Sequence, residues 1–220
     1  LGTADKTDRL LEITKPRFLL IDDGDIADAF LDKFPKARLF DPFVHSFNPL
    51  AGIDYKRARD FAEVLYTASP QGQDTLTVRN GKRAVARYFL SFDNLAKLQS
   101  WLERKAEQEE LTPTQAEALG TVNDLLFSPV LRRILCGGLK PFRFGEGTTV
   151  AKLDRAVLGD FDAFVLGALI IGQHQGQIVV PDFGFYGRPL HTSLMRQGRL
   201  TAGLNFLDEV PRALAQALLT

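Results

Sequence analysis

The chain has 220 residues, of which 45% are hydrophobic and 25% are charged, and 27 Lys and Arg residues balance 27 Asp and Glu residues. This length and apolar content allow a continuous buried core, which excludes a disordered chain, and a single cysteine, Cys136, excludes an internal disulfide scaffold. A protein that coats nucleic acid through its overall field is basic. Any contact with nucleic acid must therefore come from a local patch or from a ring formed on oligomerisation.

The first residues carry no targeting signal. The opening segment is charged and lacks the apolar centre of a signal peptide. The longest apolar stretch, residues 161–171, is shorter than the roughly 20 residues that span a bilayer. These features and the lone cysteine predict a cytoplasmic chain with no membrane segment. Because the chain begins at Leu1 and its only methionine is Met195, we expect a native start upstream.

Strand-like and helix-like segments alternate in the first part of the chain. In chain order we expect a strand at residues 17–22, a helix at 26–34, a strand at 36–40, and helices at 58–65 and 78–90. The first helix follows from the four-residue spacing of Ile26, Phe30 and Phe34. Asp54 is the expected N-cap of the next helix.

The middle of the chain predicts helices only. We expect them at residues 93–111, 113–126 and 126–135. Thr112 followed by Pro113 is typical of a helix start, and Gly137 and Gly138 end the last helix. No repeat template recurs. We therefore predict a single domain over residues 1–220, with a compact helical insertion at about 93–138.

The last part returns to alternating elements. We expect strands at residues 148–153, 177–181 and 204–207, and helices at 161–172, 190–198 and 210–219. The alternation predicts an α/β fold with a mostly parallel sheet. Acids follow four of the strands: Asp22, Asp41, Asp154 and Asp182. Ligands of open parallel sheets bind at that edge, although helix N-caps give the same pattern.

The sequence gives little support for a metal site or for a catalytic nucleophile. His45, His174 and His191 are far apart and show no metal-ligand spacing, so we interpret them as surface or loop histidines. Ser193 lies outside a nucleophile-elbow motif. Cys136 is interpreted as a small buried apolar residue.

A partial phosphate-binding motif stands at the front of the chain. Lys6 and Thr7 precede a helical segment, as the lysine and hydroxyl of a P-loop do, and Gly2 is the only glycine before them. Asp5 occupies the position of a glycine in that motif, and its carboxylate would repel phosphate.

The segment near residue 180 resembles the strand that supplies the Mg²⁺-orienting acid of a P-loop nucleotide site. An apolar strand ends in Asp182, which suits an acid that orients Mg²⁺ through water, but Phe183 stands where a catalytic glutamate is usual. Arg196 and Arg199 could face the phosphates held by a neighbouring subunit.

Together these segments resemble the FtsK–HerA superfamily of P-loop motors, and most closely its conjugative coupling-protein (TraG/TraD-like) branch. The sharpest match is Asp41-Pro42 with Asn48-Pro49-Leu50, and the matching pieces FLLIDDGD, TTVAKLDRAVLG, QIVVPDF and MRQGRLTAGLNFL follow in family order. The similarity covers most of residues 17–210.

The resemblance implies a RecA-like P-loop NTPase core that forms a homo-oligomeric ring, hydrolyses ATP and moves DNA. By position, Gly2, Lys6 and Thr7 would contact nucleotide, Thr7 and Asp182 would hold Mg²⁺, and Arg199, with Arg196 as the second candidate, would act in trans. The expected function is an ATP-dependent DNA-translocating or packaging motor domain, in conjugative transfer or a phage-type system.

Two other interpretations stay open. The departures at Asp5 and Phe183 favour a catalytically inactive ATPase-like adaptor or assembly module. A stand-alone α/β enzyme could instead use the acids at the strand ends. The basic pairs Lys82-Arg83 and Arg132-Arg133 are interpreted as solvated helix faces.

Overall fold

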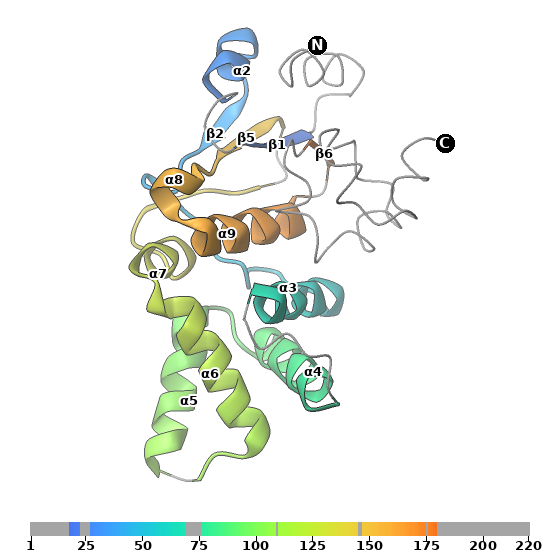
Figure 1. The fold of residues 1–220 in the computed structure, drawn as a ribbon, viewed down its shortest axis with the longest axis vertical. Coiled ribbons are helices and arrows are strands. Elements are labelled where there is room, and N and C mark those ends of the chain that lie inside the picture. Colours follow the sequence, from blue (N-terminus) through green and yellow to red (C-terminus); the bar gives the residue numbers. More distant parts are fainter. Residues whose placement is uncertain are drawn as a thin grey trace, which may run out of the picture. The chain divides into compact units, whose positions relative to one another are not determined.

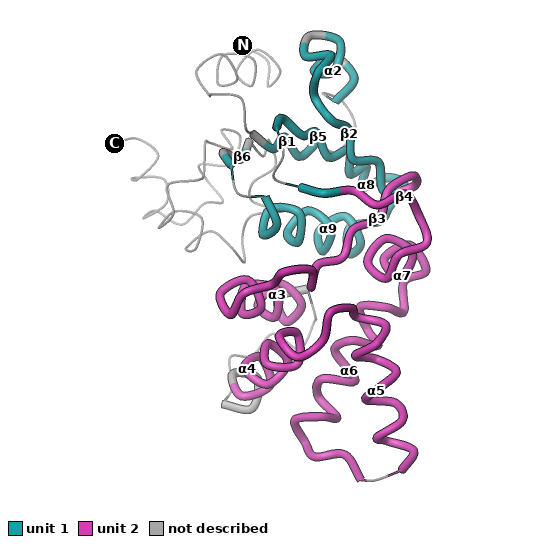
Figure 2. Tube along the Cα trace, turned by 180° about the vertical axis from the view of Figure 1, so that it is seen from behind, with its two compact units in different colours: residues 1–42, 143–220 teal, residues 43–142 magenta. Residues whose placement is uncertain are grey.

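The computed structural model describes residues 18–22, 27–68, 76–108, 110–144, 147–174 and 176–179. The chain divides into two compact units, residues 1–42 with 143–220 (unit 1) and residues 43–142 (unit 2), shown in Figure 2. The described elements of unit 1 are β1 (Phe18–Asp22), α2 (Ala27–Lys33), β2 (Arg38–Phe40), β5 (Thr149–Lys152), α8 (Arg155–Leu158), α9 (Asp160–Gln173) and β6 (Gln177–Val179). Those of unit 2 are β3 (His45–Ser46), α3 (Tyr55–Ala68), α4 (Leu76–Ser91), α5 (Leu95–Gln108), α6 (Pro113–Phe127), α7 (Pro129–Leu135) and β4 (Lys140–Pro141).

Unit 1 contains a four-stranded sheet in the order β2-β5-β1-β6 (Figure 1). Every pairing in it is parallel, so strands distant in sequence become neighbours: β1 lies between β5 and β6. Leu19, Leu20 and Ile21 of β1 are almost completely buried, as expected for an inner strand of a parallel sheet. The predicted α/β class with a parallel sheet is therefore confirmed for the described residues.

The core of unit 1 combines the sheet with apolar helix faces. Leu20 of β1 and Val150 of β5 pack with Ala27 and Phe30 of α2. Of the stripe predicted from Ile26, Phe30 and Phe34, the rings of Phe30 and Phe34 stack at 4.6 Å, and Ile26 lies outside the described residues. Helix α9 buries residues on most of its circumference, which explains why its sequence is apolar throughout.

Unit 2 is a helical bundle closed by a short strand pair. Helix α3 packs on α4, α4 packs on α6, and α6 packs on both α5 and α7. Strands β3 and β4 pair in parallel, with His45 opposite Lys140, and join the two ends of the unit. The helical unit is larger than the insertion expected at residues 93–138, because α3 and α4 pack on its other helices.

Helix boundaries follow the predicted capping residues. Asp54 Oδ1 accepts a hydrogen bond from Arg57 N at 2.8 Å, which confirms the predicted N-cap of α3. Thr112 and Gln115 form a reciprocal capping box at the start of α6. Ser128 alone separates α6 from α7 and caps α7, which begins with Pro129, and Gly137, with φ of 83°, lies just beyond the end of α7.

Some elements differ from the sequence prediction. Strands β3 and β4 and the four-residue helix α8 were not expected, since segments this short show no periodicity. The segments predicted at residues 190–198, 204–207 and 210–219 lie outside the described residues. In the part of the chain that the structure describes, no helix has the length and apolar character needed to cross a membrane.

Candidate functional site

The carboxyl edge of the parallel sheet in unit 1 is the candidate site. The register places Asp22 of β1 opposite Lys152 of β5, and Phe40 of β2 opposite Ala151. Asp41 therefore follows β2 at the edge where β1 and β5 end. The expected convergence of acids that follow strands is confirmed for Asp22, Asp41 and Asp154, which stand at, one residue after and two residues after the ends of three parallel strands.

Asp22 is the buried acid of this edge. Its side chain is 2% exposed, and Oδ2 accepts a hydrogen bond from the backbone N of Ala27 at 2.8 Å. Its backbone O accepts from Leu153 N at 2.7 Å, which extends the pairing of β1 with β5 by one residue. Asp22 therefore stabilises the start of α2 and fixes the strand end.

Lys152 adds a cation to the same edge. Its Nζ lies 3.2 Å from Oδ2 of Asp28 in the first turn of α2 and 3.3 Å from Oδ1. Lys152 is half-buried while the Asp28 carboxylate is largely exposed. A cation that is tied only to an exposed carboxylate can exchange that partner for an anionic ligand at small cost.

Asp154 serves as a helix cap. Its Oδ1 accepts from Ala156 N at 2.9 Å, and its backbone O accepts from Leu158 N at 2.9 Å. For this acid the N-cap interpretation accounts for the contacts. Among the described residues no group of three or more His, Cys, Asp or Glu side chains is placed to hold a metal ion.

The residues predicted to bind nucleotide and Mg²⁺ or to act in catalysis lie outside the described part of the chain. They are Gly2, Lys6, Thr7, Asp182, Arg196 and Arg199. The described element that precedes Asp182 in the chain is β6, which ends at Val179 and pairs with β1 through Leu19 opposite Ile178 and Leu20 opposite Val179.

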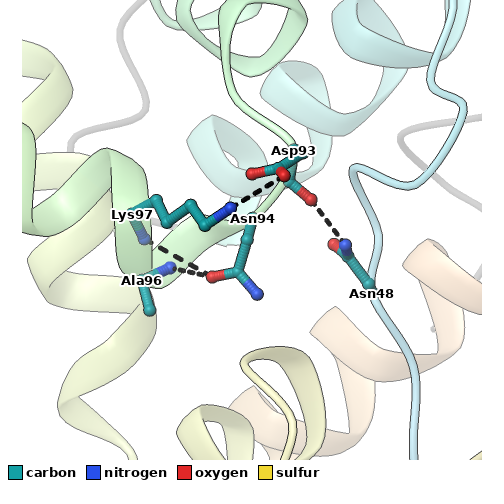
Figure 3. Close-up of polar contacts among 5 residues, drawn as sticks. All are labelled: Asn48, Asp93, Asn94, Ala96 and Lys97. Carbon is teal, nitrogen blue, oxygen red and sulfur yellow. Dashed lines mark hydrogen bonds and ion pairs between the residues drawn. The ribbon is translucent and has the colours of Figure 1, made fainter.

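The motif Asn48-Pro49-Leu50 has a structural role in unit 2 (Figure 3). The Asn48 side chain donates from Nδ2 to the backbone O of Asp93 at 2.6 Å and accepts at Oδ1 from Leu50 N at 3.0 Å. Leu50 is 2% exposed. Asn94, next to Asp93, accepts at Oδ1 from Ala96 N at 2.7 Å and so caps α5. The motif thus joins the segment before α3 to the start of α5.

The histidine and cysteine interpretations need one correction. His174 follows α9 outside any helix or strand, as a loop histidine does, but it is completely buried, so the surface alternative is wrong for this residue: the apolar end of α9 carries it into the core. His45 is half-buried and its ring packs edge-on against Phe142 at 5.2 Å, whereas His191 lies outside the described residues. Cys136 is half-buried rather than fully buried, and burial raises the pKa of its thiol.

In each of the basic pairs Lys82-Arg83 and Arg132-Arg133, one residue contacts a neighbouring helix and the other is exposed. Lys82 lies 2.8 Å from Glu63 Oε1, whereas Arg83 is exposed. Arg132 donates to the side-chain oxygen of Gln99 and to the backbone O of Leu126, although it is exposed overall. Lys82 and Arg132 therefore connect helices, and the solvated-face interpretation holds for Arg83 and Arg133.

Comparison with known proteins assigns no family to this chain. No family model matches it, and no match was found among curated proteins or solved structures. Its function is therefore argued from its own residues and from the geometry of its two units.

Proposed function

We propose that this chain is an ATP-dependent DNA-translocating or packaging motor domain of the FtsK–HerA type, most similar to the conjugative coupling-protein branch. Unit 1 would supply the RecA-like nucleotide-binding core and unit 2 the helical insertion. The active form would be a homo-oligomeric ring, in which Arg199 or Arg196 of one subunit reaches the phosphates held by its neighbour.

One observation carries the proposal: β6, the last strand in the order β2-β5-β1-β6, pairs in parallel with β1. The segment that follows β6 leads to Asp182, three residues beyond Val179. Because β6 runs parallel to β1, its carboxyl end points toward the edge that carries Asp22 and Lys152. Open parallel sheets bind ligands at this edge, which is where a nucleotide motor needs an acid for Mg²⁺.

The proposed chemistry relies on charge placed around the triphosphate. Lys6 would neutralise phosphate oxygens, and Thr7 and Asp182 would hold Mg²⁺, which offsets the charge that develops during phosphoryl transfer. Asp5 beside Lys6 lowers the expected affinity for the phosphates, because its carboxylate carries the same sign of charge.

The test is a titration of the full chain with a fluorescent ATP analogue and Mg²⁺. We expect saturable binding that Lys6→Ala weakens by at least about tenfold, which corresponds to about 1.4 kcal/mol. Asp182→Asn should remove the Mg²⁺ dependence. Lys97→Ala and Asp124→Asn are matched controls, because Lys97 and Asp124 are exposed residues of unit 2. Absence of saturable binding at millimolar nucleotide would contradict the motor proposal.

The second candidate is an ATPase-like adaptor or assembly module with the same fold. Asp5 at a P-loop glycine position and Phe183 at the position of the usual catalytic acid favour it. A folded chain that neither binds nor hydrolyses ATP, and that is unaffected by Lys6→Ala, would support this candidate instead.

A further inference from the structure

The helices α3 and α4 together carry an excess of positive charge, which the rest of the chain offsets. Helix α3 contains three basic and two acidic residues, and α4 contains four basic residues and no acid. The neighbouring pair α5–α6 has three basic residues, all in α5, against two acids in each helix. Because the whole chain is formally neutral, the residues outside α3 and α4 must carry an equal negative excess.

Two of these cations serve the fold. Arg57 donates from its guanidinium to the backbone O of Gly52 and lies 3.7 Å from Asp54, so it secures the start of α3. Lys82 pairs with Glu63 at 2.8 Å and lies over the ring of Tyr66, so it holds α4 to α3. Neither is available to a ligand without loss of those contacts.

Four further cations of the helix pair are exposed. Lys56 and Arg59 belong to α3, and Arg83 and Arg87 belong to α4. Within the described residues none of the four forms an ion pair. Helical spacing places Arg83 and Arg87 on one stripe, about 6 Å apart along the axis, on the side of α4 opposite to Val85 and Phe89.

The two helices that carry these cations pack against each other in antiparallel directions. Figure 2 shows α3 beside α4, and Phe61 stacks on Phe89 at 4.5 Å while Glu63 pairs with Lys82. Later residues of α4 therefore lie beside earlier residues of α3. This antiparallel arrangement brings the part of α3 that carries Arg59 to the level of the part of α4 that carries Arg87.

We infer that the exposed cations of α3 and α4, namely Lys56, Arg59, Arg83 and Arg87, bind the phosphate backbone of DNA. Guanidinium groups match phosphate oxygens in geometry, and cations that form no ion pair within the described residues require none to be broken first. The choice of DNA as the polyanion rests on the proposed function, whereas the charged surface does not depend on nucleotide binding. This local patch would allow a neutral chain to contact DNA.

The experiment measures binding of the full chain to a fluorescein-labelled DNA duplex by anisotropy, without nucleotide, at several salt concentrations. Arg83→Glu combined with Arg87→Glu should weaken binding by about tenfold or more and reduce the slope of log K against log salt by about 2. Arg83→Gln with Arg87→Gln should give a smaller loss in the same direction. Circular dichroism melts would show that each variant is folded.

The control combines Arg104→Glu with Arg133→Glu, exposed arginines of α5 and α7, and gives the same change in net charge. Equal weakening by the control would overturn the inference, because it would show a global charge effect. Binding to vesicles that contain phosphatidylserine but not to DNA would also overturn it. Failure of ATP binding with the Arg83/Arg87 effect intact would contradict the motor proposal and leave this inference standing.

Discussion

At the residue scale, Asn48 belongs to a motif that carries the family resemblance, and its contacts in the structure stabilise the fold of unit 2. One of its two side-chain hydrogen bonds, to the backbone O of Asp93, joins segments 45 positions apart, from before α3 to before α5, and the other accepts from the nearby Leu50 N. The amide suits this position because one side chain supplies both a donor and an acceptor. The motif therefore positions helices of unit 2.

Replacement of Asn48 by Ala should lower the free energy of unfolding by about 1–2 kcal/mol, since it removes a donor and an acceptor from a partly buried loop. Asn48→Asp keeps the acceptor for Leu50 N but sets a carboxylate against the Asp93 carbonyl, so it should be at least as damaging. Urea unfolding followed by circular dichroism measures both.

Asp93→Asn is the matched control for this prediction. It leaves the backbone carbonyl in place and loses only the exposed ion pair between Asp93 and Lys97, so its effect on stability should be much smaller than that of Asn48→Ala. If Asn48→Ala were as stable as the native chain, the bridging role of Asn48 would be refuted.

At the scale of elements, α3, α4 and α6 meet at Gly81. Tyr66 of α3 donates from Oη to Glu117 Oε1 of α6 at 2.8 Å, and burial together with this hydrogen bond raises the pKa of Tyr66. A Cβ at Gly81 would lie 2.6 Å from Tyr66 Oη and 3.0 Å from Glu117 Cγ. Glycine in α4 therefore leaves the space that this hydrogen bond needs.

Gly81→Ala should lower the stability of the chain by about 1 kcal/mol, because displacement of Tyr66 outweighs the better helix propensity of Ala. Gly120→Ala in α6 is the matched control: a Cβ there meets no other atom within 4 Å, so stability should rise by about 0.5–1 kcal/mol. Thermal melts would compare the two. In a Tyr66→Phe background Gly81→Ala should become neutral or stabilising; an unchanged cost there would rule out the Tyr66 contact.

How much of the fold the sequence predicts depends on whether the signal is local or joins distant residues. Helices with strong local signals were predicted near their observed bounds, as at Thr112 with Pro113, because a cap and a periodic stripe act within a few residues. The acids at the strand ends could also be predicted, since they follow apolar runs. The pairing of Lys152 with Asp28 could not, because it joins residues 124 positions apart.

At the scale of the whole molecule, the division into units depends on contacts that leave no local trace in the sequence. The pairing of β3 with β4 involves only two residues on each side and joins the ends of unit 2. A count of charges in each expected helix would have revealed that α3 and α4 together carry an excess of positive charge. The adjacent basic residues Lys82-Arg83 and Arg132-Arg133 do not reveal it, because each is only a two-residue motif. The candidate edge of unit 1 was predictable only through the parallel alternation of strands and helices.

Because unit 2 is one continuous segment, residues 43–142 should fold when expressed alone. Its ends are joined by hydrogen bonds from Lys140 N to Val44 O at 3.1 Å and from Phe142 N to Ser46 O at 2.7 Å. Its helices bury a core of their own that includes the fully buried Phe89 and Leu98. A segment of this size with a continuous core can be independently stable.

We expect the fragment to give a helical circular dichroism spectrum and a cooperative thermal transition. Leu98→Ala should lower its stability by about 2–5 kcal/mol, because the deletion leaves a cavity at a side chain with 0% exposure. Arg104→Ala, at an exposed position of α5, should change stability by less than about 0.5 kcal/mol. A fragment that binds a hydrophobic dye and melts without cooperativity would show that unit 2 depends on unit 1 for its fold.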